Sequence, residues 1–197
     1  WEFVLLEIFM PLGTSVAILK DNKILLTKRE DFEVWCVPGG GVDQGESIPQ
    51  AAIREAKEET GLTIRLTHMV GLYGRSKGNQ AIHNILFAAE PISGDLKPQV
   101  DEVIDMGYFT LKEALTLNLF ADHAQRIADA LNGIGGGSAW WHDAPWPFEE
   151  TIQTRKDLYD LRDQSPLSRP EFYLKNLGQM KPDEGHLEVP PTKKDDQ

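Results

Sequence analysis

The feature that most constrains the fold is the stretch GGGVDQGESIPQAAIREAKEETGL at residues 39–62. It reads as a glycine-rich loop that runs directly into a helix. Ser47 is a residue type that caps helix N-termini, and Pro49 suits a first helical turn. Gly61 is the residue type that follows a helix C-terminus. The pattern therefore predicts a loop, a helix from about Ser47 to Thr60, and a stop at Gly61.

The second half of that helix carries three glutamates at spacings of three and four residues: Glu55, Glu58 and Glu59. At about 100° per residue they share one side of the helix with small apolar residues that normally face a core. Like charges repel, and burial makes this repulsion worse. A divalent cation with oxygen ligands offsets such a cluster. The alternative from the helix alone is a solvated acidic flank beside Arg54 and Lys57.

The loop favours the first interpretation, because its spacing completes a known signature. The pattern comprises Gly40, Glu46, Arg54, Glu55, Glu58, Glu59, Gly61 and Leu62. It resembles the Nudix box, the 23-residue signature of Nudix (MutT-like) hydrolases. Ala56 stands where that family has Ile, Leu or Val, a departure that affects packing and no ligand.

The resemblance covers roughly residues 10–133 and implies a fold. It includes Pro38-Gly39-Gly40 before the box and DEVIDMGYFTLKEAL downstream of it. The implied class is α/β, an α/β/α sandwich with a mixed sheet. We expect residues 1–133 to form the Nudix domain. Residues 134–197 are expected to be a linker and a Trp-rich helical C-terminal extension with a poorly ordered tail.

Apolar alternation and turn residues predict the elements around the box. A hairpin is expected over 14–29 around Asp21-Asn22, and a short strand over 34–41. Further strands are expected over 62–74, 80–92 and 103–110. Helices are expected over 111–118, 122–133 and 149–163.

The resemblance also implies a chemistry, hydrolysis of a nucleoside diphosphate linked to another group. The family's metal ligands correspond to Glu55, Glu58, Glu59 and the carbonyl of Gly39, which implies Mg²⁺ or Mn²⁺ as cofactor. The general base differs within the family, so Glu58 and Glu55 are candidates from the box. Glu102, in a later loop, is a third candidate, as ligand or base, and an exposed loop acid is its equally weighted alternative.

Other residues have supporting or substrate roles. The resemblance implies that Glu46 and Arg54 pair and hold the box loop against its helix, together with Gly40 and Gly61. Substrate-binding candidates are the basic residues Arg29, Arg75 and Lys77, whose alternative is solvated surface. Trp35, Tyr73 and Phe87 are candidates to stack a base, whereas aromatic residues on strands more commonly belong to the core.

Charge and composition limit the partners. Lys plus Arg is 20 and Asp plus Glu is 31, a formal net charge of −11 that repels the phosphates of duplex nucleic acid. Cys36 is the single cysteine, which indicates a reducing compartment such as the cytoplasm. The opening WEFVLLEIFM lacks signal-peptide features and is too short to span a membrane.

The leading hypothesis is thus a Mg²⁺-dependent Nudix pyrophosphohydrolase acting on a small nucleotide. A nucleotide-binding sensor on the same fold, with little turnover, is the alternative. Two roles stay open for residues 138–178, where Trp140, Trp141 and Trp146 gather: a cap over the active site or a homodimer interface.

Overall fold

The computed structural model describes residues 12–77, 80–98, 101–120, 123–141, 148, 152, 155–177 and 186–192 of the chain. The chain divides into two compact units. The first is Trp1–Ala139 with Leu187–Gln197, and the second is Trp140–His186. The first unit ends at residue 139, whereas the sequence predicted a domain boundary after residue 133. That boundary stays a prediction. None of the helices in the described residues has the length and apolarity needed to cross a bilayer.

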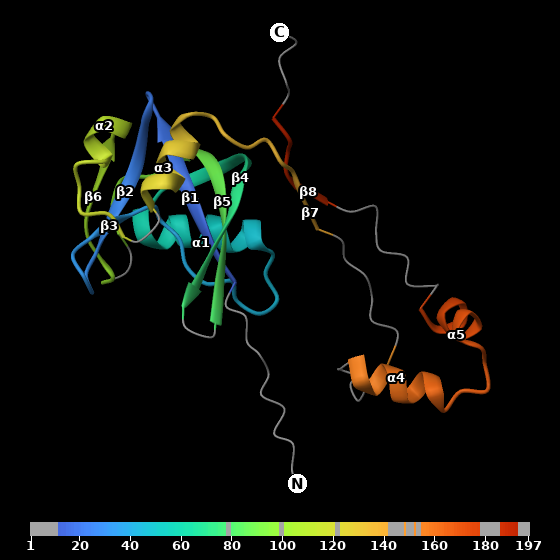
Figure 1. Ribbon diagram of the computed structural model, residues 1–197. Coiled ribbons are helices and arrows are strands. Elements are labelled where there is room, and N and C mark those ends of the chain that lie inside the picture. Colours follow the sequence, from blue (N-terminus) through green and yellow to red (C-terminus); the bar gives the residue numbers. More distant parts are fainter. Residues whose placement is uncertain are drawn as a thin grey trace. The chain divides into compact units, whose positions relative to one another are not determined.

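The first unit is built on a six-stranded mixed sheet (Figure 1). Five strands follow the order β3–β2–β1–β5–β4, and β6 pairs with β2. β1 and β5 run parallel, whereas β4 and β5 are antiparallel. The strands are β1 (Leu12–Lys20), β2 (Lys23–Arg29), β3 (Trp35–Cys36), β4 (Thr63–Lys77), β5 (Gln80–Ser93) and β6 (Val103–Phe109).

The expected hairpin joins β1 to β2. Asp21 and Asn22 both take positive φ angles, 52° and 58°, and Lys20 pairs with Lys23. Two central residues with positive φ make the hairpin turn whose twist matches that of its strands, and Asp and Asn tolerate this conformation better than most residues.

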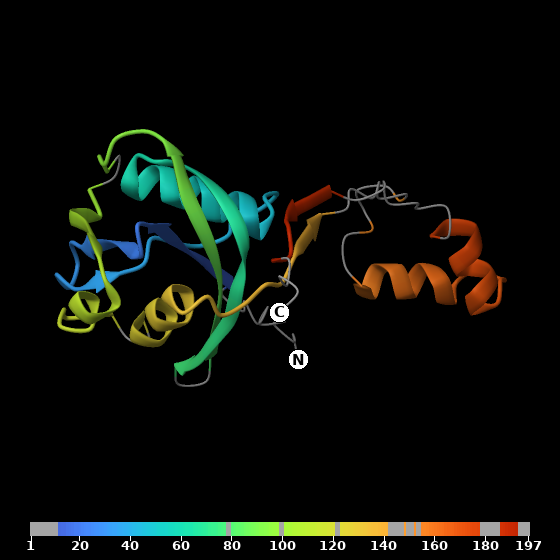
Figure 2. The same ribbon diagram turned by 90° about the horizontal axis from the view of Figure 1, so that it is seen from above.

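Helices cover both faces of the sheet, with α1 on one side and α2 and α3 on the other (Figure 2). These are α1 (Ile48–Thr60), α2 (Leu111–Ala114) and α3 (His123–Leu131). Successive strand residues point to opposite faces. Val16 and Ile18 therefore join the core beneath α1, whereas Ala17 joins the core beneath α2 and α3. This layered arrangement confirms the predicted α/β fold class.

Helix α1 has the ends that its sequence predicts. The Gln50 backbone N–H donates to Ser47 Oγ at 3.2 Å, and Ser47 N–H donates to Gln50 Oε1 at 2.9 Å. This reciprocal capping box satisfies donors that the first turn leaves unpaired. At the other end Gly61 has φ 75°, and a Cβ there would lie 2.5 Å from the Lys97 carbonyl oxygen. Glycine is therefore required at this end of the helix.

Part of the segment expected to be a linker packs on the sheet. Met69 N–H donates to the Gly137 carbonyl at 3.1 Å, and Gly136 N–H donates to the Met69 carbonyl at 3.0 Å. Next come β7 (Ala139–Trp141) and its pairing partner β8 (His186–Val189). The tail expected to be poorly ordered thus includes a strand, and Val189 is fully buried in the core beneath α1.

The second unit contains α4 (Arg155–Asp163) and α5 (Arg169–Asn176). Ser168 N–H donates to Glu171 Oε2 at 2.9 Å in a capping box at the start of α5, and Phe172 is buried. The sequence predicted a helix here from residue 149, and most of residues 142–154 lie outside the described part of the chain. The two roles left open for residues 138–178 therefore stay predictions.

Candidate active site

The glycine loop lies against β1 and next to Glu55 and Glu59 of α1. Thr14 N–H donates to the Gly40 carbonyl at 2.9 Å, and Val16 N–H donates to the Pro38 carbonyl at 2.8 Å. A Cβ on Gly39 would lie 2.2 Å from the Thr14 carbonyl oxygen, and one on Gly40 would lie 2.3 Å from Glu55 Oε1. Gly39, whose φ is 153°, is therefore required by the close backbone, whereas a side chain at Gly40 would displace the Glu55 carboxylate.

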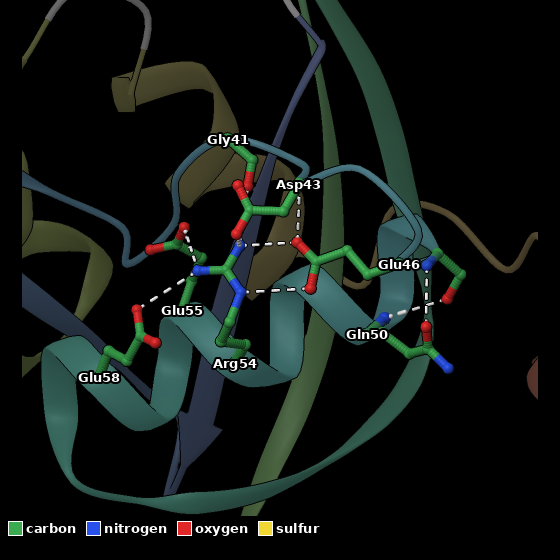
Figure 3. A network of polar contacts seen from close by, with 8 residues as sticks. Gly41, Asp43, Glu46, Gln50, Arg54, Glu55 and Glu58 are labelled. Atoms are coloured by element: carbon green, nitrogen blue, oxygen red, sulfur yellow. Dashed lines mark hydrogen bonds and ion pairs between the residues drawn. The ribbon is translucent and has the colours of Figure 1, made fainter.

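Arg54 joins this loop to the helix (Figure 3). Its Nε donates to Glu46 Oε2 at 3.2 Å and its Nη2 to Glu46 Oε1 at 2.7 Å. Nη2 also donates to the Gly41 carbonyl at 3.0 Å. Such two-pronged pairing fixes geometry as well as charge, and it lowers the pKa of Glu46. The contact that the resemblance assigns to Glu46 and Arg54 is present.

The same guanidinium contacts two of the three helix glutamates. Arg54 Nη1 donates to Glu55 Oε1 at 2.9 Å and to Glu58 Oε2 at 3.3 Å (Figure 3). The Glu58 side chain is 42% exposed and that of Glu55 15%, so Glu58 is the more accessible to a ligand. Across the described residues, no three His, Cys, Asp or Glu side chains converge into a ready-made metal site.

Glu59 lies in a different environment from its neighbours. Its Oε2 accepts from Gly39 N–H at 3.2 Å and from Thr27 Oγ1 at 3.4 Å. The pKa of Glu59 is raised to about 7, mainly by burial; the negative charges of Glu55 and Glu102 add to this shift, whereas the Gly39 N–H and the Arg29 guanidinium oppose it. The carboxylate is thus held in place but short of positive charge.

Glu102 is brought beside Glu59 by the pairing of β2 with β6. Glu30 N–H donates to the Glu102 carbonyl at 2.9 Å, just before β6 begins. One cavity, which we call the acidic cavity, is lined by Thr27, Arg29, Glu30, Asp31, Glu59, Glu102 and Val103. The structure therefore brings the loop candidate Glu102 together with the box.

The carboxylates raise one another's pKa values by electrostatic repulsion. Burial raises the pKa of Glu55, Arg54 opposes this, and the charges of Glu58 and Glu102 raise the pKa again. Such mutual repulsion in a partly buried set of hard oxygen donors fits a divalent cation. Because Arg54 contacts two of these carboxylates, a cation that uses both must share them with its guanidinium.

Comparison with known proteins agrees with this geometry. A family model described as "NUDIX domain" matches residues 10–130. The chain belongs to the Nudix family. Its relatives are named as pyrophosphatases and hydrolases, which supports the predicted enzyme class, a hydrolase of phosphoric anhydride bonds.

Individual relatives place this Nudix chain in a varied group. It is 35% identical over 124 residues to the "ADP-ribose pyrophosphatase" of Methanocaldococcus jannaschii, across 60% of this chain and 72% of that protein. It is 31% identical over 128 residues to the "NAD-capped RNA hydrolase NudC" of Pseudomonas aeruginosa, 63% of this chain but only 45% of NudC. The solved ADP-ribose pyrophosphatase of Streptococcus suis superposes with a TM-score of 0.56 at 27% identity, covering 62% of this chain and 90% of that one.

The substrate candidates are distributed unevenly. Arg29 lines the acidic cavity and pairs with Asp31, with its Nε 2.8 Å from Asp31 Oδ1. Arg75 and Lys77 belong to β4, but their side chains lie outside the described part of the molecule. Phe87 is 1% exposed and belongs to the core, so it is closed to a ligand.

The other two aromatic candidates have partners within the domain. Trp35 packs edge-to-face on Phe109, with ring centroids 5.0 Å apart. Tyr73 donates its hydroxyl to Asp129 at 2.7 Å, and Arg126 lies over its ring at 5.2 Å. Both side chains are therefore held in place by the fold.

Sequence reasoning missed several polar residues near the site. Thr27 contacts Glu59, and nothing in its local sequence distinguishes it from any other strand threonine. His123 and Arg126 had a usable signal: with Ile127 and Ala130 they have the spacing of one helix face, and that face of α3 is buried. A charged residue on a buried apolar face is rarely without a function or a partner.

Proposed function

We propose that this Nudix protein hydrolyses the diphosphate linkage of a small nucleotide by attack of water on phosphorus, with Mg²⁺ or Mn²⁺ as cofactor. The observation that carries the proposal is the electrostatic interaction of four glutamates: Glu55 with Glu58 and Glu102, and Glu59 with Glu55 and Glu102. The pKa values of Glu55 and Glu59 are raised by burial and by their acidic neighbours. Two partly buried carboxylates with acidic neighbours are costly to keep charged unless cations join them.

Glu55, Glu58, Glu59 and the Gly39 carbonyl are the groups that would hold the cation. When bound, it supplies charge neutralisation for the diphosphate and a lowered pKa for water. Glu59 suits a fixed ligand, because Gly39 N–H and Thr27 hold its carboxylate. The Pro38 and Gly40 carbonyls accept hydrogen bonds from β1, so the Gly39 carbonyl between them is the candidate backbone ligand of the cation.

Three glutamates are candidates to remove the proton from the attacking water: Glu58, Glu55 and Glu102. Glu102 lines the acidic cavity without contacting Arg54 in any described bond, whereas the other two share that guanidinium. Comparison of Glu102→Gln with Glu58→Gln separates them, because loss of the base lowers kcat and removes the acidic limb of its pH profile.

The experiment that tests the function is a nucleotide panel with identified products. ADP-ribose, NADH, ATP and GTP are incubated with Mg²⁺ in water labelled with ¹⁸O, and products are read by mass spectrometry. We expect a nucleoside monophosphate and one labelled phosphate group from at least one substrate. Glu58→Gln should abolish this turnover, whereas Glu90→Gln, at a surface pair with Arg65, should not. Binding of every nucleotide with turnover of none would indicate the sensor instead.

The remaining assignments follow from the same proposal. A nucleotide hydrolase whose single cysteine, Cys36, is buried fits the reducing cytoplasm, and we propose that compartment. The net charge of −11 argues against duplex nucleic acid as a partner. For residues 138–178 we keep both proposals, a cap and a homodimer interface. Analytical ultracentrifugation of the intact chain distinguishes them, since only the second requires a dimer.

A further inference from the structure

The turn after β2 places a carboxylate directly on the guanidinium of Arg29, through two atoms on each side. Arg29 Nε donates to Asp31 Oδ1 at 2.8 Å, and its Nη2 donates to Asp31 Oδ2 at 2.6 Å. Such two-pronged pairing fixes the orientation of a guanidinium as well as its position. Both residues line the acidic cavity. The direction in which Arg29 points in this cavity therefore depends on Asp31.

The backbone around this pair is irregular in two places. The register of β2 against β6 shifts between Lys28 and Arg29. A shift of this kind turns a side chain in a new direction, and such shifts are common beside active sites. Glu33, in the turn that Arg29 N–H closes by donating to the Val34 carbonyl at 2.9 Å, takes a φ of 52°. That conformation is unfavourable for a residue other than glycine. Irregular backbone thus flanks the Arg29–Asp31 pair on both sides.

Arg29 is also attracted by a carboxylate that we assign to the cation. Its hydrogen bond with Asp31 is the main reason that the pKa of Arg29 is raised; burial opposes this shift, and the charges of Asp31 and Glu59 add to it. Burial raises the pKa of Glu59, and the Arg29 guanidinium is one of the groups that oppose this. The two side chains attract each other and line the same cavity. An Arg29 that closed on Glu59 would occupy oxygen atoms that a cation needs.

We propose that Asp31 is a positioning residue that holds Arg29 away from Glu59 and so keeps this carboxylate open to the cation. The inference rests on the proposed function, because it takes Glu59 as a cation ligand. An ordinary surface ion pair is the alternative, since the side chains of Arg29 and Asp31 are 40% and 42% exposed. Exposed pairs contribute little to stability. Loss of Asp31 should therefore change cation affinity and leave the urea midpoint of unfolding almost unchanged.

Calorimetric titration with Mn²⁺ in the absence of nucleotide tests the positioning. Asp31→Asn keeps the size of the side chain and removes its charge, so Arg29 should turn to Glu59 and lower the Mn²⁺ affinity about fivefold. Asp31→Glu keeps the charge and should restore most of the affinity. Glu33→Gln is the matched control, because Glu33 lies in the same turn but pairs with Lys28 at 3.6 Å. It should stay within about twofold of the wild type.

A double-mutant cycle separates positioning from the simple loss of a negative charge. In Arg29→Met no guanidinium is left to turn, so the further change Asp31→Asn should alter the Mn²⁺ affinity by less than about twofold. A nearby negative charge that acted alone would give the same loss with and without Arg29, and that result would overturn the inference. Equal Mn²⁺ affinity in wild type and Asp31→Asn would overturn it as well.

The crystal structure of metal-free Asp31→Asn gives a readout that needs neither cation nor turnover. We expect the Arg29 guanidinium within hydrogen-bond distance of the Glu59 carboxylate, and an Arg29 that has not turned would overturn the inference.

Turnover distinguishes failure of this inference from failure of the proposed function. Because the cation competes with Arg29 for Glu59, excess Mn²⁺ should restore the kcat of Asp31→Asn, whereas a kcat that stays low at saturating Mn²⁺ would indicate a structural defect and overturn the inference. The expected pattern of Mn²⁺ affinities without turnover of any nucleotide would keep the role of Asp31 and overturn the proposed hydrolase. No Mn²⁺ binding to the wild type would overturn both.

Discussion

Two segments hold the N-terminal half of α1, and they differ in how far along the chain their contacts reach. The box loop is joined to the helix through Glu46 and Arg54, eight residues apart. Strand β8 reaches the same helix through Glu188, whose Oε1 accepts from the capping Ser47 Oγ at 2.7 Å, 141 residues away. The first contact belongs to a pattern that can be read locally. The second leaves no local trace, although it touches the cap of the same helix.

The two contacts differ in their expected roles, since one lies beside the groups assigned to catalysis and the other stabilises the helix. The loop side is the part of α1 next to the box loop, and it carries the carboxylates that we assign to the cation. The β8 side is the part next to strand β8, which contributes a fully buried Val189 and one hydrogen bond at the cap. Substitutions on the loop side should therefore change activity more than stability. Substitutions on the β8 side should do the reverse.

The largest expected effect is on turnover. Glu59→Gln keeps the size of the side chain and removes its charge, so hydrolysis of the best substrate should fall about a thousandfold. Glu188→Gln, the same change on β8, should leave kcat/KM within about twofold. Steady-state kinetics with Mg²⁺ measures both. A thousandfold loss in Glu188→Gln would erase the distinction between the two sides.

The next effect is a pH dependence of stability on the loop side. Without a cation, the folded Glu59 has a pKa of about 7, above its ordinary value of 4.5. The folded state then binds more protons than the unfolded state between these values. The stabilisation is complete below about pH 4.5 and is lost as pH rises through about 7, by up to about 3 kcal/mol.

Urea unfolding of metal-free protein between pH 4.5 and 8 measures this loss. Glu59→Gln should remove the part of this pH dependence that comes from Glu59, because the amide does not titrate. Mg²⁺ should reduce it in the wild type, because a bound cation favours the charged carboxylate. Identical pH profiles for wild type and Glu59→Gln would contradict the assigned burial of Glu59.

On the β8 side, Val189→Ala should cost about 2 kcal/mol in the free energy of unfolding, since it leaves a cavity in the core beneath α1. Leu187→Ala, two residues earlier and 44% exposed, is the control and should cost much less. Hydrogen exchange of the α1 amides reports the change locally. A smaller loss in Val189→Ala than in Leu187→Ala would show that β8 does not pack as described.

The smallest expected effect is the coupling across the cap. A double-mutant cycle of Ser47→Ala and Glu188→Ala isolates their hydrogen bond, and we expect an interaction energy of about 1 kcal/mol. Ser47→Ala alone should cost more than the coupling, because it also removes the bond from Gln50 N–H. An interaction energy near zero would mean that the two segments support α1 independently.

What the sequence predicted follows the same division. The hairpin at Asp21-Asn22 and the bounds of α1 were predictable, because each depends on local conformational preference. The mixed sheet was expected only from the resemblance to the Nudix family. The contact of Glu59 with Thr27, the hydrogen bond from Arg126 to Ser15 and the packing of Val189 were not predictable. They depend on which strands the sheet places side by side, and a single sequence contains no direct record of that.

The most direct test of the central claim, that the α1 carboxylates hold a divalent cation for diphosphate hydrolysis, is a calorimetric titration with Mn²⁺ in the absence of nucleotide. We predict saturable binding to the wild-type protein, at least tenfold weaker binding to Glu58→Gln, and unchanged binding to the surface control Glu90→Gln. Equal Mn²⁺ affinity in wild type and Glu58→Gln, or no binding to the wild type, would contradict the account.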